Sequence, residues 1–343
     1  MGALVSIVTP CYNGEAYLDR FFQSILRQTY DDLEIVFVDD GSKDKTREIA
    51  NFYQCEFEKK GIRFVYFFQE NAGQAAALNR GLKHFTGEYL LCVDSDDEIS
   101  EDFVKKRVLF LENNSEYAYC YGKAIGVSDD AFKKITCVYE KRNKSGKNDF
   151  FEDILYVKDV FFSGYMIRTS AFEKVIQDRE IYAGPGGQNA QILLPMAWYY
   201  GEPGYVEGTV YTYYIRSSSH SHSQNTCEKI IRQLCNYEDI LVGTIDKIQD
   251  QAAQEYKSEV LKYYARLKFG NAVDTKKPNL IRKYYQKLKQ VDCITWHDRM
   301  LYLKYASVFS WRKGFEEEDI YINYSLKGMI DDIKRLIKKV VLR

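Results

Sequence analysis

The sequence lacks paired cysteines and long apolar runs, and both absences narrow the class of protein. None of the eight cysteines forms a C-x-x-C pair, which excludes the usual zinc-ribbon and thioredoxin-like motifs. Because the cysteines are scattered through apolar segments, we expect reduced, buried thiols in a cytoplasmic protein. No run of about 18 apolar residues occurs. The first residues carry neither the basic nor the apolar segment of a signal peptide. We therefore predict no membrane-spanning helix and no secretion signal.

An excess of charge of one sign is also missing. The chain has 48 basic and 49 acidic residues among 343, a formal net charge of −1. The chain as a whole therefore has no electrostatic basis for binding nucleic acid. Hydrophobic residues make up 45%, which is ordinary for a globular protein, and the length allows about two domains.

Strand-like and helix-like segments alternate through the first hundred residues. We expect strands at 4–9, 34–38, 62–68 and 89–93, separated by helices at 16–28, 45–57 and 75–82. The strand segments are almost wholly apolar, as a parallel sheet covered on both faces requires. This spacing predicts βαβ units and an α/β fold with a mostly parallel sheet.

Acidic residues follow two of these strands. Residues 39–42 read DDGS and residues 94–97 read DSDD. Ligands of open α/β sheets bind beyond the carboxyl ends of the strands, and a D-x-D pair there can share Mg²⁺ or Mn²⁺. Each cluster alone could be only a turn that caps the next helix. Neither G-x-G-x-x-G nor a P-loop motif is present, which disfavours dinucleotide and P-loop binding.

Four ordered motifs resemble those of the family-2 glycosyltransferases of GT-A fold, a Rossmann-like architecture. They are VSIVTPCYN at 5–13, VDDGSKD at 38–44, NAGQAAALNRG at 71–81 and VDSDD at 93–97. The match covers about residues 4–100, and weaker landmarks continue to about 223. The resemblance implies transfer of a sugar from a nucleotide diphosphate, usually with inversion and with Mn²⁺ or Mg²⁺.

The resemblance also implies roles for single residues on the donor side. Pro10, Tyr12 and Asp39 match positions that hold the base, with Tyr12 stacking on uracil and Asp39 taking its imide. Gly73 and Gln74 match the loop at the ribose and diphosphate, although Leu78 stands where the family often has an arginine. In the D-x-D segment, Asp94 and Ser95 are expected to contact the donor. Asp96 is the expected metal ligand, and Asp96 and Asp97 are candidate catalytic residues.

The acceptor side departs from the family pattern. Residues 161–168 read as a strand and resemble the segment that flanks the acceptor site. Gln188 and Asn189 stand where the family commonly has Glu-Asp, the usual general base, and an amide cannot accept a proton at neutral pH. We treat both as candidate catalytic residues with the base unassigned; Asp178 and Glu180 lie upstream as weaker candidates.

Residues 211–223 resemble the family's closing loop. Alignment with that loop places Arg216 where the family binds the diphosphate, and a guanidinium there can bind two phosphate oxygens. His220 and His222 are candidate metal ligands or loop-ordering residues; as histidines in a serine-rich loop they could equally be plain surface.

The composition turns helical after residue 225, so we predict a catalytic domain at 1–225 and a helical domain at 226–343. Helices are expected from about 228, at 256–269, from Pro278, at 296–311 and at 324–342. The last is basic and amphipathic. It could lie on the inner face of the cell membrane or pack on its own domain, and both interpretations stay open.

The sequence therefore predicts an inverting, metal-dependent hexosyltransferase that moves a sugar from a UDP-sugar to a hydroxyl of a growing bacterial glycan. Capsule, exopolysaccharide and O-antigen are the glycans in view, with a lipid-linked acceptor possible. The alternative is a non-catalytic, nucleotide-sugar-binding relative, which the missing Glu-Asp supports. A sugar-phosphate nucleotidyltransferase would need a Gly-rich, Arg-bearing loop after the first strand, which residues 10–14 do not supply.

Overall fold

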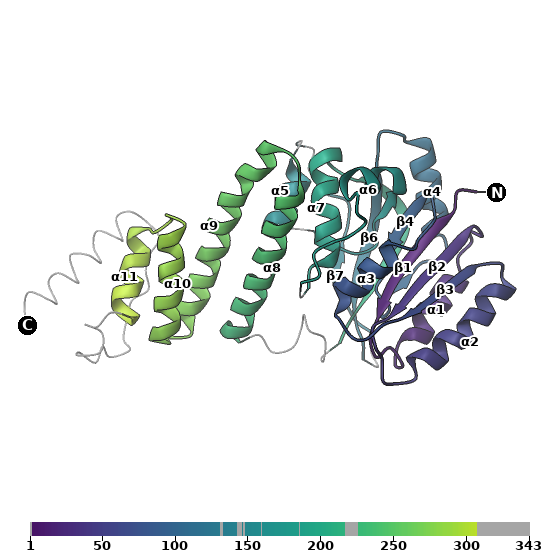
Figure 1. The fold of residues 1–343 in the computed structure, drawn as a ribbon, viewed down its shortest axis with the longest axis horizontal. Coiled ribbons are helices and arrows are strands. Elements are labelled where there is room, and N and C mark those ends of the chain that lie inside the picture. The colour runs from purple at the N-terminus through teal and green to yellow at the C-terminus, as the bar shows by residue number, and fades with distance from the viewer. Residues whose placement is uncertain are drawn as a thin grey trace, which may run out of the picture.

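An α/β half is followed by an arm of helices in this computed structural model (Figure 1). It describes residues 2–130, 133–142, 146, 148–158, 160–184, 186–216 and 226–306. The predicted fold class is confirmed: a mixed sheet with a parallel half is flanked by helices, and further helices come after it.

The predicted strands form the parallel half of the sheet, in the order β3-β2-β1-β4. Their bounds are β1 (Val5–Cys11), β2 (Leu33–Asp39), β3 (Arg63–Phe68) and β4 (Tyr89–Cys92). Helices α1 (Leu18–Leu26), α2 (Thr46–Lys59) and α3 (Gln74–Leu82) connect them. Every residue of β1 and β2 is buried, as the apolar runs of the sequence predict.

Successive residues of β1 belong to different cores because side chains alternate across a strand. Ile7 packs in a core that includes residues of α1 and α2, whereas Val8 packs in a core that includes residues of α3. Two packed faces hold the strands in fixed register, so the loops that follow them have fixed starting points.

The second half of the sheet is mixed. It contains β5 (Glu98–Ile99), β6 (Tyr119–Ser128), β7 (Ile135–Tyr139), β8 (Met166–Arg168) and β9 (Gly204–Ile215). Helices α4 (Phe103–Asn113), α5 (Asp149–Tyr156), α6 (Thr169–Val175) and α7 (Gln188–Tyr200) accompany it. The strand expected at 161–168 is shorter than predicted, since only β8 pairs. Gly164 just before it has a φ of +76°, which an extended strand cannot contain.

The helical arm comprises, in the described part of the chain, α8 (Cys227–Lys247), α9 (Gln251–Asp274), α10 (Pro278–Gln290) and α11 (Trp296–Tyr305). Figure 1 shows α8 and α9 beside α5 and α7, with α10 and α11 farther from the sheet. Leu241 of α8 and Tyr264 of α9 belong to the same core as Leu193 of α7, so packing continues across residue 225. A separate core joins α8 and α9 to α10 and α11. The segment predicted as a helix at 324–342 lies outside the described residues.

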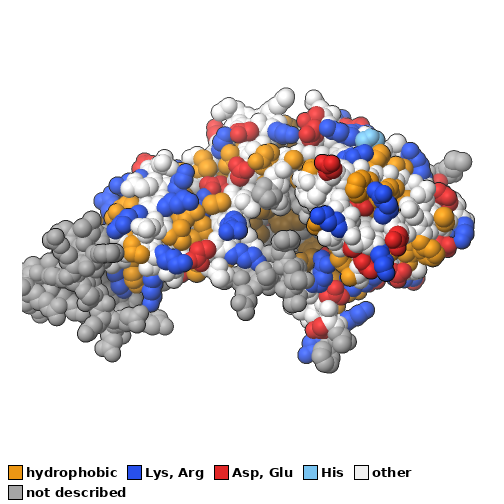
Figure 2. Space-filling view, turned by 60° about the horizontal axis from the view of Figure 1, so that its bottom comes forward, with side chains coloured by type: hydrophobic (Ala, Val, Ile, Leu, Met, Phe, Trp, Pro, Cys, Tyr) orange, Lys and Arg blue, Asp and Glu red, His pale blue; other side chains and the backbone are white. Residues whose placement is uncertain are grey.

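Acidic and basic side chains are interspersed over the face shown in Figure 2, in keeping with a net charge near zero. The same view shows a hollow near the middle of the molecule with apolar side chains at its floor. No helix within the described ranges is long and apolar enough to cross a membrane.

Candidate functional site

The carboxyl ends of β1, β2 and β4 bring the predicted donor-side residues to one edge of the sheet. In the parallel register Cys11 lies beside Asp39, and Val8 lies beside Cys92. The segments that follow these strands therefore meet at that edge, as the sequence predicts. Pro10 is buried within β1, whereas Tyr12 just beyond the strand is 46% exposed and presents its ring to solvent.

Asp39 is buried at the end of β2 and held by two hydrogen bonds. The backbone N–H of Ser42 and the hydroxyl of Tyr66 each donate to its carboxylate at 2.8 Å. Asn13 ties the first loop to the same turn, because its backbone N–H donates to Ser42 Oγ at 2.9 Å. These two hydrogen bonds give the carboxylate a fixed orientation at the edge of the sheet where Tyr12 follows β1.

Asp40, to which the sequence analysis gave no role, fixes the loop that leads into α3. Its carboxylate accepts hydrogen bonds from the backbone N–H groups of Ala72 and Gly73, both at 2.9 Å. Gly73 has a φ of +92°, a conformation that favours glycine, and α3 begins at the next residue, Gln74. The second aspartate of the DDGS turn therefore places Gln74 at the site.

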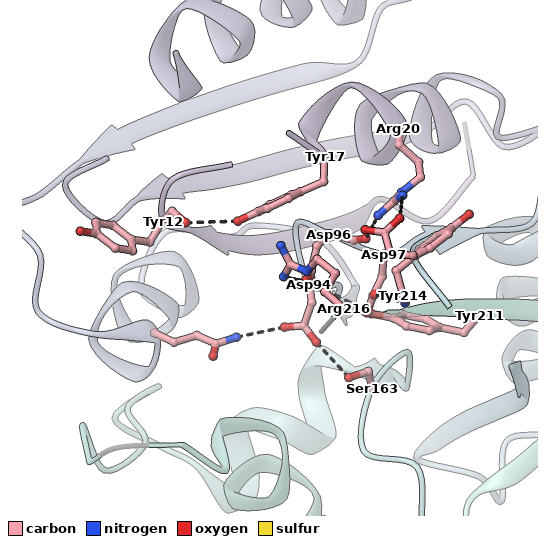
Figure 3. Close-up of polar contacts among 12 residues, drawn as sticks. Tyr12, Tyr17, Arg20, Asp94, Asp96, Asp97, Ser163, Tyr211, Tyr214 and Arg216 are labelled. Carbon is pink, nitrogen blue, oxygen red and sulfur yellow. Dashed lines mark hydrogen bonds and ion pairs between the residues drawn. The ribbon is translucent and has the colours of Figure 1, made fainter. Parts of the chain in front are cut away.

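Asp94 lies at the centre of a hydrogen-bonded chain that joins the donor and acceptor sides. Gln74 Nε2 donates to one carboxylate oxygen at 3.1 Å, and Ser163 Oγ donates to the other at 3.0 Å (Figure 3). Asn189 Nδ2 donates in turn to Ser163 Oγ at 3.1 Å. Burial, reinforced by the charge of Asp96, raises the pKa of Asp94 to about 6. Ser163 is thus a site residue that the sequence analysis did not single out.

Asp96 forms an ion pair with Arg216, the residue that follows β9. The guanidinium of Arg216 also lies 4.5 Å from the centroid of the Tyr17 ring, and Figure 3 shows the three side chains together. Arg20 holds the same segment, because its Nη2 donates to the backbone carbonyl of Asp96 at 2.8 Å. Burial raises the pKa of Asp96 above its usual range, although Arg216 opposes this effect. Ser95 between the two carboxylates is buried.

Asp97 points away from solvent and into the protein. The hydroxyl of Tyr211 donates to its carboxylate at 2.7 Å, and the backbone N–H of Tyr214 donates at 3.2 Å. The Tyr211 hydroxyl also accepts a 3.3 Å hydrogen bond from the backbone N–H of Asp94. Burial raises the pKa of Asp97 well above its usual range. Through these hydrogen bonds Asp97 links the D-x-D loop to β9.

The candidate acceptor-side residues lie at the start of α7, which Gly187 introduces with a φ of +64°. Asn189 is hydrogen-bonded to Ser163 and so belongs to the hydrogen-bonded chain around Asp94. Gln188 beside it is half-buried. Asp178 and Glu180 are instead engaged by lysines, at 3.7 Å by Lys247 and at 2.7 Å by Lys83.

The carboxylates of Asp94 and Asp96 suit a hard divalent cation, because both are partly buried oxygen ligands, although Arg216 already pairs with Asp96. No group of three His, Cys, Asp or Glu side chains that could hold a metal ion occurs in the part of the chain that the structure describes. These two residues would supply only part of a coordination sphere, which diphosphate oxygens can complete. His220 and His222 lie outside the described residues.

Comparison with known proteins agrees with this geometry. Residues 6–176 match the model of the family described as "Glycosyl transferase family 2". Glycosyltransferase GlyA of Streptococcus pneumoniae is 45% identical over 101 residues, which are 29% of this chain and 14% of that protein. An uncharacterized glycosyltransferase of Rickettsia prowazekii is 26% identical over 293 residues, 84% of this chain and 85% of that protein. The matches to the first three curated relatives span 14%, 48% and 36% of their lengths, less than half in each case.

A solved structure supports the fold across most of the chain. The structure of S. aureus TarS residues 1–349 in complex with UDP-GlcNAc superposes with a TM-score of 0.51 at 16% identity. The superposition covers 93% of this chain and 95% of that one. At this identity the likeness shows a shared fold, including the helices that follow the sheet.

Proposed function

This chain belongs to glycosyltransferase family 2 and has the GT-A fold, and we propose that it transfers a hexose from a UDP-sugar to a hydroxyl of a growing bacterial glycan, with inversion. The observation that carries the proposal is the placement of Asp39 and the Asp94–Asp96 pair at one edge of the sheet. A base can lie between Tyr12 and Asp39 while its diphosphate extends toward Gln74 and Asp94.

The proposed roles follow from the contacts of each side chain. Asp94 and Asp96 would hold Mn²⁺ or Mg²⁺, which would neutralise charge on the departing nucleoside diphosphate. Arg216 lies beside Asp96 and supplies a guanidinium suited to phosphate oxygens. Gln74, with its amide already at 3.1 Å from Asp94, would face the same group. Asp97 acts as a positioning residue through Tyr211.

The acceptor hydroxyl would approach from the side of Ser163 and Asn189. Inversion requires this oxygen to attack the anomeric carbon from the face opposite the departing diphosphate, while its proton passes to a base. Asn189 can orient the hydroxyl but cannot take its proton at neutral pH. The amides Gln188 and Asn189 are also the observation that favours a second candidate, a relative that binds nucleotide sugars without transferring them.

Binding of a nucleotide sugar tests the proposal directly. Calorimetry on the full chain would compare UDP-sugars with GDP-mannose, each with Mn²⁺ and with a chelator. We expect tight binding of one UDP-sugar that the chelator weakens, and release of UDP when a glycan acceptor is added. Binding without any transfer would favour the non-catalytic candidate. Failure of every nucleotide sugar to bind would overturn both.

We also propose that the chain works in the cytoplasm with a peripheral contact to the membrane. The support is the basic amphipathic sequence at 325–343, which lies outside the described residues. Deleting these residues should release the protein from sedimented anionic vesicles without changing UDP binding. Equal sedimentation of both forms would remove the membrane contact from the proposal.

A further inference from the structure

Helix α10 and the residues beside it carry charge of one sign, although the chain as a whole is balanced. Residues 275–291 contain six basic side chains and no acidic one, whereas the whole chain has 48 basic and 49 acidic residues. The six are Lys276, Lys277, Arg282, Lys283, Lys287 and Lys289. The balance of the whole chain therefore conceals a local excess of positive charge on the helical arm.

The apolar face of α10 is already used within the arm. Ile281, Tyr284, Tyr285 and Leu288 are buried in the core that joins α10 to the neighbouring helices. The Tyr285 ring also stacks on that of Tyr302 in α11, with centroids 4.2 Å apart. Residues three and four positions apart share one face of a helix, so the opposite face of α10 points away from this core.

The outward face of α10 presents its lysines to solvent. Three lysines are exposed and form no ion pair among the described residues: Lys283, Lys287 and Lys289. Arg282 lies to one side of this face, where its Nε donates to the backbone carbonyl of Ala306 at 2.8 Å. The outward lysines are thus available to a partner that carries negative charge.

The acidic side chains around α10 leave this charge largely uncompensated. Glu228 of α8 pairs with one lysine of the stretch at 2.6 Å. Glu238 of α8 and Asp298 of α11 are each paired with a basic residue of α9. Asp274 and Asp292 stand just outside the two ends of the stretch. With the Glu228 pair set aside, five basic side chains remain against these two aspartates.

Helix α11 adds exposed apolar side chains to the same end of the arm. Trp296 is 42% exposed and Leu303 is 52% exposed, and their separation of seven residues places them on one helix face. Arg299 between them is exposed as well. Figure 2 shows Lys and Arg side chains on the arm with hydrophobic side chains between them. Basic side chains beside an indole ring are typical of surfaces that contact anionic bilayers.

We propose that α10 and α11 form a docking face for an anionic phospholipid surface. The inference rests on the proposed function, which assigns a membrane contact to residues 325–343, and adds a second contact on other residues. The lysines of α10 attract the headgroup phosphates, while Trp296 and Leu303 enter the headgroup layer. These exposed apolar side chains favour a lipid surface over a nucleic acid, and so does a net charge of −1 on the whole chain. Two weak contacts on one arm bind more firmly than either alone.

The test measures sedimentation of the full chain with vesicles of phosphatidylcholine, alone and mixed with phosphatidylglycerol. We expect binding to the mixed vesicles only, and its loss at high salt because exposed charges are screened. Each lysine at such a surface contributes a factor of about five in affinity. A triple variant should therefore bind about tenfold or more weakly: Lys283→Gln, Lys287→Gln and Lys289→Gln.

Matched controls separate this face from the total charge. One control removes the same charge from three exposed lysines of the α/β half and should bind nearly as wild type: Lys60→Gln, Lys105→Gln and Lys174→Gln. Trp296→Ala should weaken binding several-fold, whereas Phe52→Ala, at a side chain that is 61% exposed on α2, should not. Melting temperature and UDP affinity should match wild type in every variant, which distinguishes a lost contact from a lost fold.

Several outcomes would overturn the inference. They are failure of the wild type to bind mixed vesicles, equal loss in the two triple variants, and equally tight binding of polyuridylate at the same salt concentration. If deleting residues 325–343 abolishes binding while the α10 variant retains it, the contact in the proposed function stands and this one fails. Vesicle binding without any binding of UDP-sugars would instead count against the proposed function alone.

Discussion

Arg216 and Asp96 form an ion pair across the candidate site, although 120 residues separate them in the sequence. The pair links the end of β9 to the D-x-D loop, so the last residue before the undescribed 217–225 segment is held at the donor side. A diphosphate and its cation would compete for these same two partners, the phosphate for Arg216 and the cation for Asp96. The pair therefore occupies the positions that ligands would later take.

Replacing Asp96 with alanine should abolish transfer. The variant removes a carboxylate that we propose holds the divalent cation, and that cation would neutralise charge on the departing diphosphate. Loss of such stabilisation typically costs about 100-fold or more in turnover. Steady-state release of UDP would measure the effect. Asp102→Ala is the control, because its carboxylate is 46% exposed and contacts Lys106 and the Thr29 hydroxyl, away from the candidate site. Wild-type turnover in Asp96→Ala would exclude the metal role.

Asp39→Asn should weaken UDP binding. Hydrogen bonds to a charged group are worth about 1.5–3 kcal/mol, which corresponds to about 10- to 100-fold in the dissociation constant. Calorimetry with UDP alone isolates this step from acceptor chemistry. Asp31→Asn on the exposed loop before β2 provides the comparison. An unchanged UDP affinity in the Asp39 variant would remove this residue from the base site.

The stability of the metal-free protein should depend on pH through Asp94. Burial raises its pKa from 3.8 to about 6, so the folded state binds the proton more tightly than the unfolded state. This contribution to stability is present below pH 4 and is lost as the pH rises through 6. At about 1.36 kcal/mol per pKa unit, wild type should lose up to about 3 kcal/mol relative to Asp94→Asn between pH 4 and 7. Urea unfolding with a chelator would measure it, and parallel stability curves for the two proteins would contradict the shift.

Arg107→Ala should destabilise the fold and disturb the site. Arg107 is fully buried, its guanidinium donates to the carbonyl of Gly164, and it lies 3.6 Å from the centroid of the Phe103 ring. Truncation leaves a cavity and an unbonded carbonyl, for a cost of about 2–5 kcal/mol by analogy with other large-to-small core changes. Thermal unfolding would show it, with Lys106→Ala, whose side chain is 42% exposed, as the neighbouring control. Equal melting temperatures would mean that Gly164 is held by other contacts.

Ending the chain at residue 225 should destabilise the α/β half. Leu241, Ile245, Val260 and Tyr264 belong to the core that α7 shares with the arm, and the Tyr264 hydroxyl donates to the carbonyl of Leu155 at 2.9 Å. A chain ending at 306 keeps these contacts and should melt at a higher temperature than one ending at 225. Calorimetric scans of both forms provide the measurement. Equal melting temperatures would instead support independent domains divided at 225.

The sequence predicted the parallel half of the sheet well because burial on both faces leaves continuous apolar runs. β1 to β4 and the helices between them lie within a few residues of their expected bounds. The sequence also predicted that Asp39 and Asp94 lie at the same edge of the sheet, since parallel strands end at one edge. The pairing of β8 with β4 and β6 could not be predicted from the sequence, because a three-residue strand after a glycine leaves no periodic pattern.

The acceptor side was the least predictable part of the site. Ser163 reaches Asp94 across 69 residues, and Gly164 beside it has a φ of +76°. Such contacts arise from tertiary packing and leave no signal in local spacing. Asp40 differs, because a second aspartate in a tight turn could have been expected to hold a neighbouring loop.

The hydrophobic core that α7 shares with α8 and α9 also has a consequence for synthesis of the chain. The ribosome completes residue 225 some 39 residues before Tyr264, the last member of that core. Translation proceeds at about 5–20 residues per second, so the apolar face of α7 stays uncovered for roughly 2–8 s until the helices that pack on it have been synthesised. During that interval the nascent chain presents Leu193 and its neighbours uncovered, which makes this stretch of translation the period when a chaperone would be of most use.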